Sequence, residues 1–171
     1  MDTIIETSRL TLRKLRLEDA SDLSLVLSDE ESMIHYPHAF SAEEVKRWIE
    51  RNQERYQKDG FGLWAVVRKA DHQFIGDCGI TLQHIDNEIL PEIGFHTINR
   101  YCNKGYATEA AEACLEYALN VLGFKSVYSY SRLSNAASQK VASKIGMQKI
   151  KTFVQDGVDI VVYQYRHPKH S

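Results

Sequence analysis

The sequence has few cysteines, no long apolar run and almost no net charge, and each absence excludes a class of protein. Its three cysteines, Cys78, Cys102 and Cys114, match no zinc-binding spacing and cannot all pair with one another. We therefore expect a reducing, cytoplasmic setting and no bound metal. No stretch approaches the roughly 20 apolar residues that cross a bilayer. The formal net charge of −2 gives no single-sign field to hold nucleic acid or an anionic membrane.

One domain is expected over residues 1–171, because no repeat, low-complexity tract or Pro/Gly-rich linker interrupts them. The fold class is predicted to be α/β (α+β), with a mixed, mostly antiparallel sheet, one crossover and flanking helices. Exposed strand edges near the last turn are compatible with a monomer or a homodimer. Periodicity and caps predict strands at 9–13, 62–68, 73–83, 89–97 and 126–131, a hairpin around Asp156-Gly157, and helices at 18–27, 41–60, 105–122 and after Asn135.

The strand predicted at 89–97 contains Pro91 and Gly94. Proline lacks the N–H of a ladder bond, and glycine inside a strand often marks a bulge. The run therefore predicts an irregular strand with a bulge. A bulge there is either a plain structural kink or a way to expose a backbone N–H to a ligand.

A second unusual segment, Arg100 to Thr108, leads directly into the longest predicted helix. Small residues at Gly105 and Ala107 let a ligand approach the backbone, and the free N–H groups of a first helical turn attract a pyrophosphate. Lys104 and Arg100 could add positive charge. The segment lacks the Gly-Lys-Ser/Thr ending of an NTPase loop and the three glycines of a dinucleotide fold. The alternative is that Gly-x-Ala only permits a tight turn and close helix packing.

The residues Asn103 to Ala110 resemble the acetyl-CoA loop of the GNAT superfamily, in the branch that contains the ribosomal-protein N-terminal acetyltransferases. Ile93-Gly94-Phe95 lies where that family has a splayed central strand. Asn135 to Ser138, followed by Lys144 to Met147, is similar to the family's next motif, and Glu6 to Arg13 is typical of the branch. Cys102 stands where the superfamily usually has Gln, Arg or Trp.

The resemblance implies a single GNAT-like domain with splayed central strands that binds acetyl-CoA as co-substrate. It implies direct transfer of the acetyl group to a primary amine, with a protein N-terminus as the expected acceptor, in a ternary complex. Alternatives are a polyamine, an amino acid or an antibiotic as acceptor, or a non-catalytic acyl-CoA-binding protein. The residues implied in cofactor binding are Ile93, Gly94, Phe95, Thr97, Cys102, Asn103, Lys104, Gly105, Tyr106, Ala107, Thr108, Asn135 and Ser138.

Ser138 is the candidate to support the departing thiolate. Many superfamily members use a tyrosine one turn later, where this chain has Ala142. The alternative is a small buried serine bonded back to its own helix. Asn135 is explained as a helix N-cap and could also contact the pantetheine arm.

Glu92 is the candidate general base, since a partly desolvated carboxylate on the splayed strand would have a raised pKa. The alternatives are a structural salt bridge for Glu92, His96 or Asp77 as the base, or proton loss directly to solvent. Tyr36 and Trp48 belong to the segment that lines the acceptor groove in this family, although a tryptophan at helical spacing is more often core.

A thiol at Cys102 near a helix N-terminus would have a lowered pKa if exposed, but the sequence offers no paired base for a covalent route. Packing is therefore the preferred interpretation of Cys102.

Overall fold

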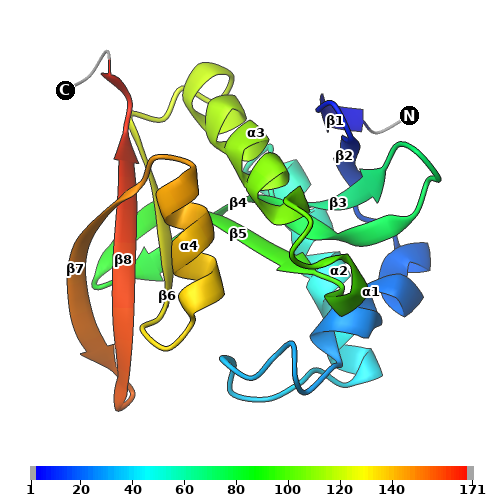
Figure 1. The fold of residues 1–171 in the computed structure, drawn as a ribbon, viewed down its shortest axis with the longest axis horizontal. Helices are drawn as coiled ribbons and strands as arrows, with labels where there is room; N and C mark the ends of the chain where they lie inside the picture. The colour runs from blue at the N-terminus through cyan, green and yellow to red at the C-terminus, as the bar shows by residue number, and fades with distance from the viewer. Residues whose placement is uncertain (1–2, 169–171) are drawn as a thin grey trace.

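The computed structural model describes residues 3–168, which form one eight-stranded sheet covered by helices (Figure 1). The spatial order is β1-β2-β3-β4-β5-β6-β8-β7, and all neighbours are antiparallel except β5 and β6. The strands are β1 Thr3–Glu6, β2 Leu10–Lys14, β3 Leu63–Arg68, β4 Phe74–Ile85, β5 Glu88–Thr97, β6 Ser126–Arg132, β7 Gln148–Gln155 and β8 Val158–Arg166. The predicted α/β class is confirmed; β1 is an additional strand that the sequence pattern did not predict.

The helices lie on both faces of this sheet. Asp77 and Cys78 are neighbours on β4 and therefore point to opposite faces. Asp77 accepts a hydrogen bond from Trp48 of α2, whereas Cys78 contacts Cys114 of α3. The longer helices are α1 Ala20–Leu27, α2 Ala42–Lys58, α3 Tyr106–Asn120 and α4 Ala136–Lys144, and the 3-10 turns are η1 Leu17–Asp19 and η2 Asn99–Tyr101. Within residues 3–168, no helix is long and apolar enough to cross a membrane.

Local signals set the ends of several elements as predicted. At the start of α2, Ser41 Oγ accepts the Glu44 N–H at 3.2 Å and Glu44 accepts the Ser41 N–H at 2.9 Å, which completes the capping box. Asn135 caps α4 by accepting the Ser138 N–H at 3.1 Å. Asp156 and Gly157 both have positive φ, as a tight turn between β7 and β8 requires.

The prediction of a bulge in β5 is wrong. The pairing of β5 with β4 is continuous from Thr97 opposite Gly76 to Glu88 opposite Ile85, through both Pro91 and Gly94. The irregularity lies on the other side of β5, which pairs with β6 only between Glu92 and Tyr128. Pro91 has no N–H, but on the β6 side of β5 almost no ladder bonds form, so none is lost. A proline is therefore tolerated in this central strand.

Candidate active site

The sheet is split at its centre, between β5 and β6. The two parallel strands meet at the Glu92–Tyr128 pair and diverge beyond it, so the β6-facing backbone groups after Glu92 have no strand partner among the described residues. Side chains alternate along β5. Glu92, Gly94 and His96 face α1 and α2, whereas Ile93, Phe95 and Thr97 face α3. The residues expected at the acetyl group therefore lie at this open edge of β5.

The N-terminus of α3 presents unbonded donors beside this split. The first helical bond runs from Glu109 N–H to Gly105 C=O at 3.0 Å, which leaves the N–H groups of Tyr106, Ala107 and Thr108 free for an acceptor outside the helix. Gly105 has φ +84°, where a side chain is strained. Asn103 also has a positive φ, of 61°. Asparagine tolerates this left-handed conformation better than most residues.

Arg9 of the segment between β1 and β2 fixes this loop from 100 residues away in sequence. Its Nε lies 2.7 Å from Glu109 Oε1, its backbone N–H donates to Glu109 Oε2 at 3.0 Å, and its Nη1 donates to Lys104 C=O at 3.1 Å. The sequence interpretation noted the Glu6–Arg13 segment without assigning Arg9 a role. No local pattern could have paired Arg9 with Glu109.

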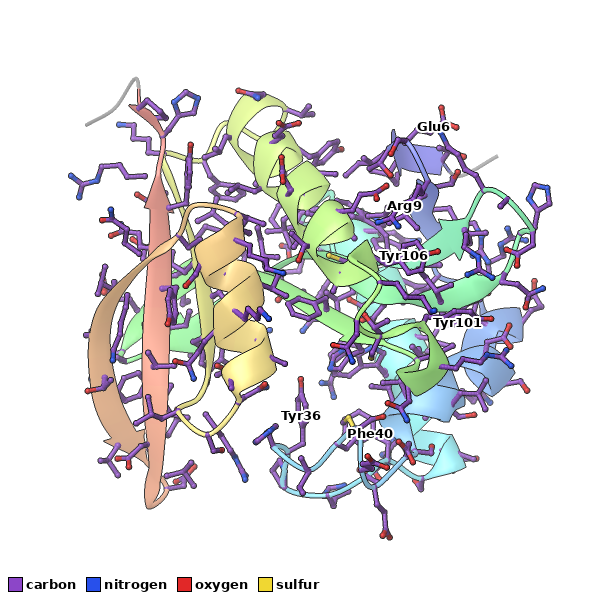
Figure 2. The ribbon with its side chains drawn as sticks, viewed as in Figure 1. Glu6, Arg9, Tyr36, Phe40, Tyr101 and Tyr106 are labelled. Atoms are coloured by element: carbon purple, nitrogen blue, oxygen red, sulfur yellow. The ribbon has the colours of Figure 1, made fainter. Side chains whose placement is uncertain are left out.

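The ring and the hydroxyl of Tyr106 are both engaged by arginine side chains. Arg9 stacks on its ring at 4.4 Å from the centroid, and its hydroxyl accepts a hydrogen bond from Arg68 at 3.3 Å. Figure 2 shows Arg9, Tyr106 and Tyr101 gathered at this end of α3. The tyrosine ring thus belongs to the support of the loop.

Cys102 is partly buried, with Sγ 3.6 Å from the carbonyl oxygen of Thr97. Burial raises the pKa of its thiol, so the lowered pKa expected for an exposed thiol does not apply. A thiol that is protonated at neutral pH is a poor nucleophile. The geometry supports packing as the role of Cys102.

Glu92 occupies the split itself. Burial raises the pKa of its carboxyl to about 8, against the opposing effects of the Tyr130 backbone N–H and the charge of Arg55. Within residues 3–168, Glu92 makes no ion pair, which argues against the structural salt bridge. A carboxyl that titrates near neutral pH inside a strand opening is suited to accept a proton.

Tyr36, His96 and Asp77 form a chain of hydrogen bonds on the α1–α2 face. His96 Nδ1 lies 2.8 Å from Asp77 Oδ1, and His96 Nε2 lies 2.9 Å from the Tyr36 hydroxyl. The Trp48 indole N–H donates to Asp77 Oδ2 at 3.1 Å, and its ring packs edge-on against His96 and Phe40. Trp48 is therefore a packing and hydrogen-bonding residue behind the site, whereas Tyr36 reaches toward it.

On the other side of the split, α4 presents Ser138. The Asn135 side chain is used as the helix cap. The Ser138 hydroxyl is partly exposed and makes no hydrogen bond to any residue that the structure describes. The alternative of a serine bonded back to its helix is thus absent from the structure. Ala142 is buried and packs in the core.

A central sheet that opens beside a helix N-terminus, with a titratable carboxyl in the opening, is the arrangement expected of the acyltransferase class that the sequence motifs resemble. Residues 9–148 match the acetyltransferase (GNAT) domain family. The chain belongs to this family, as the resemblance of its motifs implied.

Known proteins agree with this assignment. The chain is 34% identical over 163 residues to the uncharacterized protein YkkB of Bacillus subtilis, covering 95% of both chains. It shares the fold of a GNAT-family acetyltransferase from Bacillus anthracis, with a TM-score of 0.83, 24% identity, and 95% and 97% of the two chains covered. It also shares the fold of RimL, a ribosomal L7/L12 α-N-protein acetyltransferase solved with coenzyme A, with a TM-score of 0.78, 16% identity, and 96% and 97% covered.

Proposed function

We propose that this acyltransferase moves an acetyl group from acetyl-CoA to a primary amine, with a protein N-terminal amine as the acceptor, by direct attack. The observation that carries the proposal is Glu92, whose pKa is raised to about 8 at the open edge of β5. All three cysteines are free, which supports a reducing, cytoplasmic compartment.

The residues present fit acetyl-CoA, which would supply an activated acetyl thioester. The first-turn N–H groups of Tyr106, Ala107 and Thr108 would bind its pyrophosphate, and Lys104 would add charge. Backbone N–H groups at the open edge of β5, from Ile93 to Phe95, would polarise the acetyl carbonyl. Both sets of donors are fixed in place before the ligand binds, because Arg9 and Glu109 hold the loop and β4 holds the strand.

The chain's own groups and solvent then account for the protons. As the C–N bond forms and the C–S bond breaks, the nitrogen loses a proton and the thiolate gains one. Glu92 would accept the proton from nitrogen. Solvent water would supply the proton that the thiolate gains. The Ser138 hydroxyl would donate a hydrogen bond to the sulfur, directly or through that water, and Asn135 would hold Ser138 in place through its backbone.

An α-amine is favoured as acceptor by its acidity. An N-terminal amine has a pKa of about 8, whereas a lysine amine has a pKa of about 10.4 and is almost wholly protonated at neutral pH. The activity of RimL, an α-N-protein acetyltransferase of the same fold, agrees with this choice.

The test is acetyl-CoA turnover against a panel of peptides with free N-termini, matched peptides with blocked N-termini, polyamines, amino acids and aminoglycosides. We expect turnover of free peptides and none of blocked ones. If only a small amine were acetylated, the acceptor would be a small molecule and not a protein N-terminus. CoA binding by titration calorimetry without turnover of any amine would make the protein a non-catalytic acyl-CoA binder.

A further inference from the structure

We propose that Tyr36, His96 and Asp77 form a proton relay that converts the protonated acceptor into the neutral amine before attack. Tyr36 is the catalytic residue that touches the amine, and His96 and Asp77 act through it. The proposal rests on the proposed acetyl transfer and assigns a step that Glu92 does not perform.

The hydrogen bonds fix the direction of the relay. Asp77 has a fully buried side chain and, as a carboxylate, can only accept. It accepts from Trp48 and, at 2.8 Å, from His96 Nδ1, which places the proton of a neutral imidazole on Nδ1. Nε2 is then an acceptor, and the Tyr36 hydroxyl donates to it at 2.9 Å. The Tyr36 oxygen keeps lone pairs to accept a proton from outside the chain.

The loop that carries Tyr36 contacts both halves of the split sheet. Tyr36 belongs to the loop between α1 and α2, and its neighbour His35 bonds through Nδ1 to Ser134 Oγ at 3.0 Å, one residue before the Asn135 cap of α4. Figure 2 shows the Tyr36 ring projecting from this loop toward the split. The two adjacent residues therefore hold the loop between the halves, His35 through Ser134 and Tyr36 through His96.

Three neighbouring groups raise the pKa of Tyr36 electrostatically: Asp77 on β4, Glu92 on β5 and Tyr130 on β6. Burial and these neighbours hold the pKa of Tyr36 well above its usual range. The Tyr36 hydroxyl therefore stays protonated and does not act as a base on its own. It can pass a proton on only because His96 takes one from its other side.

The proton moves along the relay in two linked transfers. The N–H bond of the ammonium breaks and its proton bonds to Tyr36 Oη, while the original phenolic proton moves to His96 Nε2. The amine keeps the electron pair and becomes neutral. His96 becomes an imidazolium beside the Asp77 carboxylate, and it returns the proton to solvent through Tyr36 after the product leaves. Glu92 remains for the second proton, which leaves nitrogen during C–N bond formation.

The decisive experiment compares two acceptors at pH 7: the best amine of the panel and its aminooxy analogue, in which an oxygen is inserted between the nitrogen and its carbon. The amine is protonated at this pH and the aminooxy nitrogen is neutral. Tyr36→Phe keeps the ring against His96 and removes the hydroxyl. We expect it to lower kcat about 100-fold for the amine and only a few-fold for the analogue, at unchanged KM for acetyl-CoA.

Tyr117→Phe removes a phenol from a half-buried ring that packs on Trp64 of the α3 face, and we expect no change with either acceptor. His96→Asn keeps an amide donor for Asp77 but lacks Nε2, and it should reproduce the selective loss without adding to Tyr36→Phe in the double variant. CoA titration and thermal melting verify that each variant is folded.

Equal losses for both acceptors, or no loss for the amine, would overturn the relay while leaving the acetyltransferase assignment intact. A wild-type protein that acetylates neither acceptor would overturn the proposed function and the relay with it.

Discussion

Glu92→Gln tests whether the split in the sheet holds a neutral carboxyl. Gln has nearly the same shape and keeps an oxygen to accept the Tyr130 N–H, but it cannot ionise. The pKa of Glu92 is raised from 4.5 to about 8, so between these values the folded protein holds a proton that the unfolded chain has released. Stability from this group is therefore fully present below pH 4.5 and is lost as the pH rises through 8.

The size of the effect follows from the shift. The difference between 4.5 and about 8 corresponds to an upper limit of about 5 kcal/mol between low and high pH. We expect Glu92→Gln and wild type to unfold in urea with similar free energies at pH 5, and the variant to be more stable by 1 to 5 kcal/mol at about pH 9. Glu88→Gln, on an exposed residue at the start of the same strand, is the matched control and should show no such pH dependence.

The same variant tests the chemistry. Wild-type kcat should rise with pH through about 8, as Glu92 loses its proton, and Glu92→Gln should abolish this rise and lower kcat at least 100-fold for both the amine and its aminooxy analogue. A stability difference that is the same at pH 5 and pH 9 would refute the raised pKa. A retained pH–rate profile would remove Glu92 from the reaction.

Three further predictions concern the cofactor side. Gly105→Val places a side chain at φ +84°, with its Cβ 3.2 Å from Arg9, and should weaken CoA binding at least 100-fold in calorimetry. The control is Gly123→Val, at φ +78° with open space around it, which should strain the backbone to a similar degree and leave CoA affinity unchanged. Arg9→Ala frees the loop and should raise KM for acetyl-CoA about 10-fold at constant kcat, so a fall in kcat alone would contradict its role as loop support. Ser138→Ala should lower kcat about 10-fold with unchanged CoA affinity, and an unchanged rate would exclude Ser138 from the mechanism.

The parts of the fold that the sequence predicted well are those decided within a few residues. The caps at Ser41 and Asn135 and the Asp156-Gly157 turn each satisfy backbone groups locally, so the residue types alone identify them. The prediction of a bulge in β5 failed because its outcome depends on distant parts of the chain. Whether Pro91 breaks a ladder depends on which neighbour its missing N–H would face, and only the assembled sheet decides that. β1 has four residues, too few for a pattern to stand out.

In the candidate site too, local relations between residues could be predicted and long-range ones could not. Asn135 and Ser138 lie within one helical turn, and their relation could be read from the motif. Tyr36 and His96 are 60 residues apart, and His96 and Asp77 are 19 apart. The sequence suggested each of these three residues separately, as a groove residue or a reserve base, because nothing local shows that they share hydrogen bonds.

In the proposed reaction, one strand separates the two substrates. Because side chains alternate along β5, Ile93, Phe95 and Thr97 face α3 and its phosphate-binding end, whereas Glu92 and His96 face the helices that carry the acceptor groove. The unpaired backbone between them lies within reach of both faces. Continuous pairing with β4 is what keeps this division, since a one-residue slip would exchange the two faces and bring the titratable residues to the cofactor side. In the proposed reaction, the regular pairing of β5 is therefore a condition for catalysis, and the opening toward β6 provides the reaction site.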